Sequence, residues 1–265
     1  MKLQSILFLL FLISFNSFAS DSLHYVRTIP VNAHLLSTDP LGNIYLVKDN
    51  NTVLKLNSKG DSIGIFNEIK KGKVTQIDAT NPLRTLLFFA EYNQIVVLNN
   101  MLTQKNVMRL NMIGLNNVAA IANSADGNIW LYDPSFGSLL KIDEQMDVIQ
   151  TADLRNLYQN PTAPTAMVEH ERSLYIADTT DGIRKFDLFG FYNTTFPFKV
   201  SNLQFFTTSM VYFASPYLYS YNMQSFSEQK ILLPQPEAIV SVRIERNNVY
   251  ILRSSSLEIY RLNDN

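Results

Sequence analysis

The chain has 265 residues, of which 22 are basic, 23 are acidic and none is cysteine. With balanced charge and no basic stripe, it is a poor candidate for binding nucleic acid or an anionic membrane surface. The lack of cysteine excludes disulfides and a thiol nucleophile, so stability has to come from a buried apolar core.

Residues 1–19 have the pattern of a secretory signal peptide. Lys2 gives a short basic start, residues 6–15 are almost wholly apolar, and Ser17-Phe18-Ala19 has the small-x-small spacing that signal peptidase recognises. The apolar stretch is shorter than the about 20 residues of a membrane-spanning helix. We therefore expect cleavage and export to the periplasm or the extracellular space. Residues 20–265 would remain as one domain that does not insert into a membrane.

A motif then repeats along the chain: a turn, an apolar strand, a polar turn, and a second strand that ends in Asn or Asp. The clearest copies lie at residues 39–46, 126–133 and 174–187, and weaker ones are centred on 86–89, 211–213 and 249–251. The second strands end at Asn57, Asn99, Asp143, Asp187, Asn222 and Asn263. The spacings are 42, 44, 44, 35 and 41 residues, which matches the period of a four-stranded propeller blade. Asn and Asp suit this place because their side chains bond the local backbone in tight turns.

These repeats predict an all-β chain folded as a six-bladed β-propeller with four antiparallel strands in each blade. The segments are short, rich in Val, Ile, Leu, Tyr and Phe, and lack a sustained helical period. The last repeat supplies only three strands before the chain ends, while residues 23–29 form a strand without a partner. We expect this N-terminal strand to pair beside residues 257–262 and close the ring, because an open ring would leave two bare edges.

The copies around Tyr45, Trp130 and Tyr175 resemble NHL-type repeats, in which Gly-Asn-Ile-Tyr-Val-Ala-Asp precedes a strand ending in Lys/Arg-x-Phe-Asp. As a period, the resemblance covers the chain from residue 20 onward. It implies a propeller that serves as a recognition module, and it implies architecture more than activity.

One position of the repeat carries acidic residues and predicts a binding surface. Asp49, Glu91, Asp133 and Asp178 each follow the first strand of the motif, and Ser215 and Arg253 take that place in the last two blades. In a closed propeller these turns share one face, where they could bind a cation, a basic peptide or another polar ligand. Turn chemistry alone also predicts Asp here, so the same residues can simply brace their turns.

Aromatic residues occupy some of the same turns, among them Tyr92, Phe136 and Tyr217. Aromatic side chains are enriched in protein interfaces, although packing between blades would also explain them. Phe136, between Ser135 and Gly137, is expected to be exposed.

The sequence therefore favours an exported, non-catalytic scaffold that presents one face to a protein partner, possibly in a cell-envelope assembly. It predicts no cofactor, and it contains none of the common hydrolase or phosphate-binding motifs. The alternative is a metal-dependent hydrolase, lactonase or lyase with a divalent cation at the channel mouth. Its ligands would come from the innermost strands, where Asp78, Asn123, Glu169 and Arg243 are the candidates.

Overall fold

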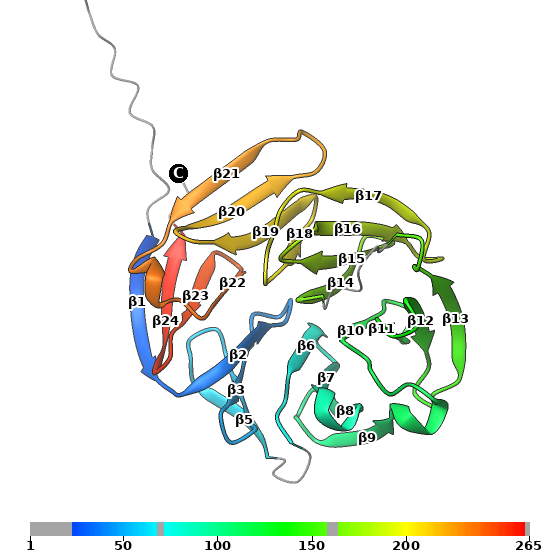
Figure 1. Ribbon diagram of the computed structural model, residues 1–265. Coiled ribbons are helices and arrows are strands. Elements are labelled where there is room, and N and C mark those ends of the chain that lie inside the picture. The colour runs from blue at the N-terminus through cyan, green and yellow to red at the C-terminus, as the bar shows by residue number, and fades with distance from the viewer. Residues whose placement is uncertain (1–22, 68–71, 158–163, 263–265) are drawn as a thin grey trace, which may run out of the picture.

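The structure, a computed structural model, describes residues 23–67, 72–157 and 164–262. Six four-stranded antiparallel sheets are arranged around a central axis, which confirms the predicted propeller (Figure 1). The predicted signal peptide and Asn263 lie outside the described residues. No described helix is long and apolar enough to cross a membrane.

The strands of each blade follow one another outward from the axis in chain order, except that β1 is the outermost strand of blade 6. Blade 1 consists of β2 (Ala33–Thr38), β3 (Ile44–Lys48), β4 (Thr52–Leu56) and β5 (Ser62–Asn67). Blade 2 consists of β6 (Gln76–Asn81), β7 (Arg84–Phe89), β8 (Gln94–Asn99) and β9 (Gln104–Arg109). Blade 3 consists of β10 (Ala120–Asn123), β11 (Ile129–Asp133), β12 (Ser138–Ile142) and β13 (Val148–Asp153). Blade 4 consists of β14 (Ala166–His170), β15 (Ser173–Asp178), β16 (Gly182–Asp187) and β17 (Tyr192–Phe196). Blade 5 consists of β18 (Gln204–Phe206), β19 (Ser209–Ala214), β20 (Tyr217–Asn222) and β21 (Glu228–Leu232). Blade 6 consists of β22 (Ser241–Glu245), β23 (Asn248–Leu252), β24 (Ser256–Leu262) and β1 (Leu23–Pro30). Three short 3-10 helices lie between strands: η1 (Ala90–Tyr92), η2 (Leu110–Ile113) and η3 (Pro236–Ala238).

The N-terminal strand closes the ring, as predicted. β1 pairs antiparallel with β24 from Leu23 opposite Leu262 to Ile29 opposite Leu257. The rings of Tyr25 and Tyr260 meet edge to face with centroids 5.7 Å apart. Blade 6 is thus built from both ends of the chain, and β1 lies beside β24 at the edge of the ring (Figure 1).

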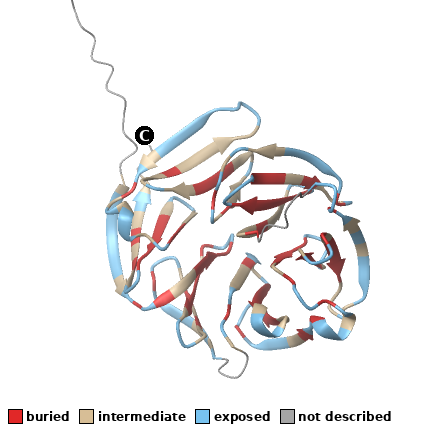
Figure 2. Cartoon of the chain, in the orientation of Figure 1, coloured by how far each residue is buried: buried red, intermediate tan, exposed pale blue. Residues whose placement is uncertain are grey.

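The apolar core lies between blades. Ile44 and Leu46 of β3 pack with residues of blade 6, whereas the alternate residues Tyr45 and Val47 pack with blade 2. Because both faces of a blade are covered, the second strands are nearly continuous apolar runs, and every residue of β7 is buried. The outer strands are mostly exposed, as the pale blue of β1 and β13 shows in Figure 2.

The Asn or Asp residue that ends each described third strand braces the following turn. In blade 3, Asp143 accepts hydrogen bonds from the backbone N–H groups of Gln145 and Asp147, both at 2.9 Å. The side-chain oxygens at the other four described positions accept equivalent backbone N–H groups: Asn57, Asn99, Asp187 and Asn222. The regular spacing in the sequence therefore has a local cause in turn chemistry.

Ring closure can be tested with a disulfide, because the chain has no cysteine of its own. His24 on β1 lies opposite Arg261 on β24, and both are exposed. We expect His24→Cys/Arg261→Cys to oxidise spontaneously and to raise the free energy of unfolding by about 2–4 kcal/mol over its reduced form. The control pair His24→Cys/Arg109→Cys, with Arg109 on blade 2, should stay reduced. A reduced first pair in folded protein would contradict the pairing of the two termini.

Candidate functional site

The six turns that follow the second strands lie on one face of the ring, as predicted. Each inner strand starts at this face, so it also carries the links from one blade to the next. We call it the linker face. The turns between the first and second strands, and between the third and fourth, lie on the opposite face.

The structure separates the four predicted acidic residues into two kinds. Asp49 and Glu91 are exposed, and one Asp49 oxygen lies 3.4 Å from Nδ1 of His34. Asp133 and Asp178 are buried, with 0% and 2% of their surface exposed. Both buried carboxylates brace their own turns. Asp133 accepts the N–H of Ser135 at 2.8 Å, and Asp178 accepts the N–H of Thr180 at 2.6 Å.

Arg253 is buried in a network of its own. Its Nε donates to Glu258 at 2.7 Å, while Nη1 and Nη2 donate to the carbonyls of Gln235 and Pro234 at 2.9 and 2.8 Å. The hydrogen bond to Glu258 is the main reason that the pKa of Arg253 is raised. These contacts fasten the link between blades 5 and 6 to β24, which is a structural role for this residue.

The predicted aromatic residues also divide. Tyr92 and Phe136 are 46% and 57% exposed on the linker face. Tyr217 is half-buried, with Nζ of Lys230 4.6 Å from its ring centroid and Tyr219 packed edge to face at 6.0 Å. Met112 of η2, which the sequence did not single out, is 70% exposed.

Two asparagines hold the linker face of blades 1 to 3 together. Asn51 donates from its amide to the carbonyl of Gly72 and accepts the N–H of Val74 at 3.0 Å. Asn93 makes the same pair of bonds one blade later, with the carbonyl of Asn116 at 2.7 Å and the N–H of Val118 at 3.1 Å.

Each of these asparagines has a positive φ and lies two residues after the acidic residue of its turn. That spacing is a sequence signal that could have revealed them. Beyond Asn93, the amide of Asn117 donates to the hydroxyl of Ser135 at 2.7 Å, next to Phe136. We call Asp49, Glu91, Tyr92, Met112 and Phe136 the rim of blades 1–3.

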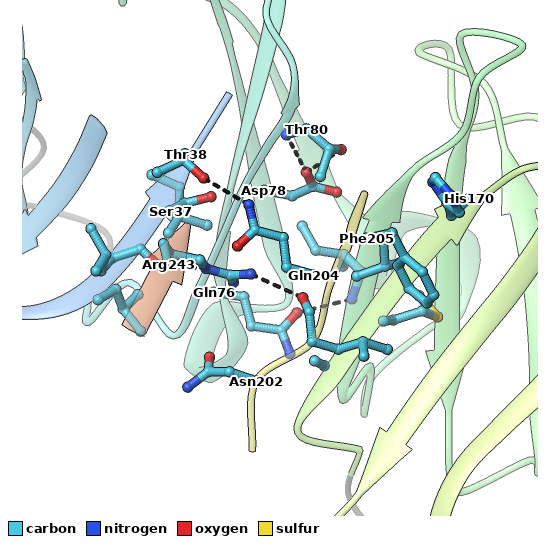
Figure 3. Close-up of a pocket in the computed structure, with 18 of the residues that line it drawn as sticks. Ser37, Thr38, Gln76, Asp78, Thr80, His170, Asn202, Gln204, Phe205 and Arg243 are labelled. Atoms are coloured by element: carbon cyan, nitrogen blue, oxygen red, sulfur yellow. Dashed lines mark hydrogen bonds between the residues drawn. The ribbon is translucent and has the colours of Figure 1, made fainter. Parts of the chain in front are cut away.

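A second candidate site is the cavity at the centre of the ring, with a volume of about 300 Å³. Its wall is formed mainly by the inner strands, and Figure 3 shows side chains from several blades converging on it. The charged or titratable groups of the lining are Asp78, Glu169, His170, Arg243 and Glu245. Asn123, predicted to belong to the channel, is not among the lining residues and bonds Nε of Arg84 at 2.9 Å.

Two of the cavity carboxylates are already engaged by the protein. Asp78 accepts the N–H of Asn123 at 2.6 Å with one oxygen and both the N–H and the hydroxyl of Thr80 with the other. Glu169 accepts the hydroxyl of Ser124 at 2.6 Å and the indole N–H of Trp130 at 2.5 Å. These carboxylates connect neighbouring blades.

Side-chain amides also tie inner strands together. Gln204 donates to the carbonyl of Ile244 at 2.6 Å and accepts its N–H at 3.1 Å, which links blades 5 and 6. Gln76 does the same between blades 2 and 3, with the carbonyl of Ala119 and the N–H of Ile121. The cavity wall is therefore held by polar side chains as well as by packing.

Arg243 and Glu245 of β22 also line the cavity. Arg243 donates to the carbonyls of Leu203 at 2.9 Å and Leu36 at 3.4 Å, and burial lowers its pKa. Burial also raises the pKa of Glu245 to about 7, because its neighbour Arg246 only partly offsets the loss of hydration and Asp39 adds to the shift. Among residues 23–67, 72–157 and 164–262, no group of three or more His, Cys, Asp or Glu side chains is placed to hold a metal ion.

No protein-family model and no curated protein sequence matches the chain. Solved propeller structures do match. A streptogramin B lyase has 10% identity and a TM-score of 0.63, with 91% of this chain and 97% of that chain covered. The WD40 domain of Pan2 from Neurospora crassa has 8% identity and a TM-score of 0.65, covering 93% and 97%. BamB from Moraxella catarrhalis has 8% identity and a TM-score of 0.55, covering 92% and 99%. At such identities the likeness shows the β-propeller fold, and the resemblance to NHL-type repeats stays a prediction.

The two roles considered for Arg253 differ in what its replacement should do. In Arg253→Met, Glu258 loses its buried partner and two carbonyls lose their donor. We expect the free energy of unfolding to fall by about 3 kcal/mol in a urea titration. Arg261→Met, on the exposed side of β24, should change it by less than about 0.5 kcal/mol. If Arg253→Met were as stable as the wild type, the structural role would be contradicted, and the predicted role of Arg253 in binding would be favoured again.

The raised pKa of Glu245 has a consequence for stability. Because the pKa of Glu245 is about 7 in the folded chain and near its ordinary value of 4.5 in the unfolded chain, the folded state binds more protons between these pH values. Stability should therefore fall as the pH rises from about 4.5 to about 7. Glu245→Gln has no carboxyl at this position and should lose this pH dependence. The difference in unfolding free energy between the wild type and Glu245→Gln should therefore change across this pH range. A difference that does not vary with pH would show that Glu245 is not perturbed.

Proposed function

We propose that the chain is an exported, non-catalytic binding scaffold that presents the rim of blades 1–3 to a protein partner. The observation that carries the proposal is the exposure of Tyr92, Met112 and Phe136 on adjacent blades, at 46%, 70% and 57%. Asp49 and Glu91 flank these apolar side chains with charge. Interfaces are enriched in aromatic residues and methionine and are bordered by polar groups, which is the composition of this rim.

The rigidity of the rim supports the same proposal. The bonds of Asn51 and Asn93 fix two turns to the links beside them, and Asn117 fixes the link before Ser135. A surface that is already ordered loses little conformational entropy when a partner binds. The exposed side chains are thus held on a pre-organised backbone.

The opposite face also exposes large apolar side chains, between 56% and 73% exposed: Leu41, Leu83, Met101, Phe189, Phe191 and Phe226. They are spread over turns of blades 1, 2, 4 and 5. Scattered exposed apolar residues are ordinary on protein surfaces, whereas a continuous group is informative. Because Tyr92, Met112 and Phe136 come from the neighbouring blades 2 and 3, we assign partner binding to the linker face; the opposite face serves as the control.

Export by a cleavable signal peptide at residues 1–19 is part of the proposal. Under it, the partner is a component of the cell envelope or of the extracellular space. A chain without cysteine is compatible with an oxidising compartment, because it has no thiol to oxidise.

The proposal can be tested with two matched triple variants used as bait on the envelope fraction of the source cell. Tyr92→Ser/Met112→Ser/Phe136→Ser should reduce capture of the wild-type partner at least about 100-fold, because interface aromatics contribute most to affinity. Phe189→Ser/Phe191→Ser/Phe226→Ser should capture it as the wild type does. Loss of capture only in the second variant would assign binding to the opposite face, and no partner with any bait would contradict the scaffold role.

A further inference from the structure

The central cavity contains two side chains of opposite charge, Arg243 and Glu245, and neither forms an ion pair with another described residue. Arg243 and Glu245 lie two residues apart on β22, and both line the cavity. Ile244 between them packs into the apolar cluster of blades 5 and 6. Because side chains alternate along a strand, the two charged residues point to the same side, with Cα atoms roughly 6–7 Å apart.

Arg243 is oriented but not neutralised. Nε and Nη1 are held by the carbonyls of Leu36 and Leu203, and Nη2 has no hydrogen-bond partner among the described residues (Figure 3). The acidic group that acts on it, Asp78, lies beyond ion-pair distance, and its oxygens are engaged by Asn123 and Thr80. A guanidinium fixed by two carbonyls keeps its full charge and presents an open N–H edge to the cavity.

Glu245 is the acidic counterpart. In the part of the chain that the structure describes, its carboxyl makes no hydrogen bond and no ion pair, although the basic Arg246 and the acidic Asp39 influence it. No ion pair joins it to Arg243 either. The other cavity carboxylates, Asp78 and Glu169, each accept at least three protein hydrogen bonds. Glu245 therefore differs from both in having its carboxyl available.

A half-buried charge without an ion-pair partner is unfavourable, and this holds for Arg243 and for Glu245. A ligand that carries both complementary charges would relieve both groups at once. We propose that the central cavity binds a small zwitterion, with its carboxylate on Arg243 and its ammonium group on Glu245. The cavity of about 300 Å³ suits a small molecule, at the lower limit of common ligand sites.

The geometry also restricts the ligand. Its two charges have to be several ångströms apart, because they meet side chains from alternate positions of one strand. An α-amino acid, whose charges are on neighbouring carbons, is too short, whereas a linear ω-amino acid fits. Phe205 and Ile77 are apolar members of the same lining. This site is independent of the rim of blades 1–3.

Binding should also release protons. With a pKa of about 7, raised mainly by burial, the Glu245 carboxyl is partly protonated at neutral pH; Arg246 and Asp39 are the charged groups that act on it, and Arg243 lines the same cavity. An ammonium group beside it favours the carboxylate and displaces that proton. The measured binding enthalpy should then depend on the ionisation enthalpy of the buffer at pH 7, and this dependence should be absent at pH 9.

The test is calorimetric titration of the protein with glycine, 3-aminopropanoate, 4-aminobutanoate and 6-aminohexanoate. We expect 4-aminobutanoate to bind best, and butanoate and butylamine, which each carry one charge, to bind at least 10-fold more weakly. Glu245→Gln and Arg243→Gln should each lower the affinity for 4-aminobutanoate at least 10-fold. Arg261→Gln, which removes an exposed charge from β24, should not.

Because Arg243→Gln also removes two inter-blade hydrogen bonds, Glu245→Gln, which preserves the shape of the side chain, is the decisive variant if the first does not fold. The proposal is overturned if none of the ω-amino acids binds with a dissociation constant below about 10 mM. Equal binding to wild type and Glu245→Gln, or equal binding of butanoate and 4-aminobutanoate, would overturn it as well.

Discussion

Burial of apolar side chains between adjacent blades is the interaction on which the whole structure depends. Each of the six core clusters combines residues of two blades, so no single blade has a core of its own. A blade at the end of an open row would leave one apolar face in water. The pairing of β1 with β24 removes that end, because it completes blade 6 from both termini.

The same arrangement determines what happens to polar groups near the axis. Inner strands of neighbouring blades approach one another without forming a continuous sheet, so their backbone groups need other partners. Gln76 and Gln204 supply these partners, because each side-chain amide donates one hydrogen bond to the backbone of the next blade and accepts another from it. Arg243 supplies them with Nε and Nη1, which donate to the carbonyls of Leu36 and Leu203. Its charged guanidinium is also part of the cavity lining.

On the linker face, a related device produces the proposed interaction surface. Asn51 and Asn93 replace missing backbone pairing between a turn and the next link, and so make the rim of blades 1–3 rigid. Buried residues at equivalent turn positions, Asp133 and Asp178, stabilise the fold instead of facing a partner. The exposed and the buried members of one repeat position thus have different surroundings.

By itself, the sequence determined the number of blades, the turn after each third strand and the strand that closes the ring. These features are local or repetitive: an Asx residue such as Asp143 bonds its own turn wherever the chain places it. Only the tertiary structure decided that Asp49 is exposed while Asp133 is buried, and that Arg253 binds Glu258 and a neighbouring link. The sequence had named Asp78, Glu169 and Arg243 as candidates at the channel, and the structure shows that all three line one cavity while Asn123 does not. The physical reason is that burial and side-chain partners depend on how strands and links of neighbouring blades pack against each other in the closed ring, which no local pattern specifies.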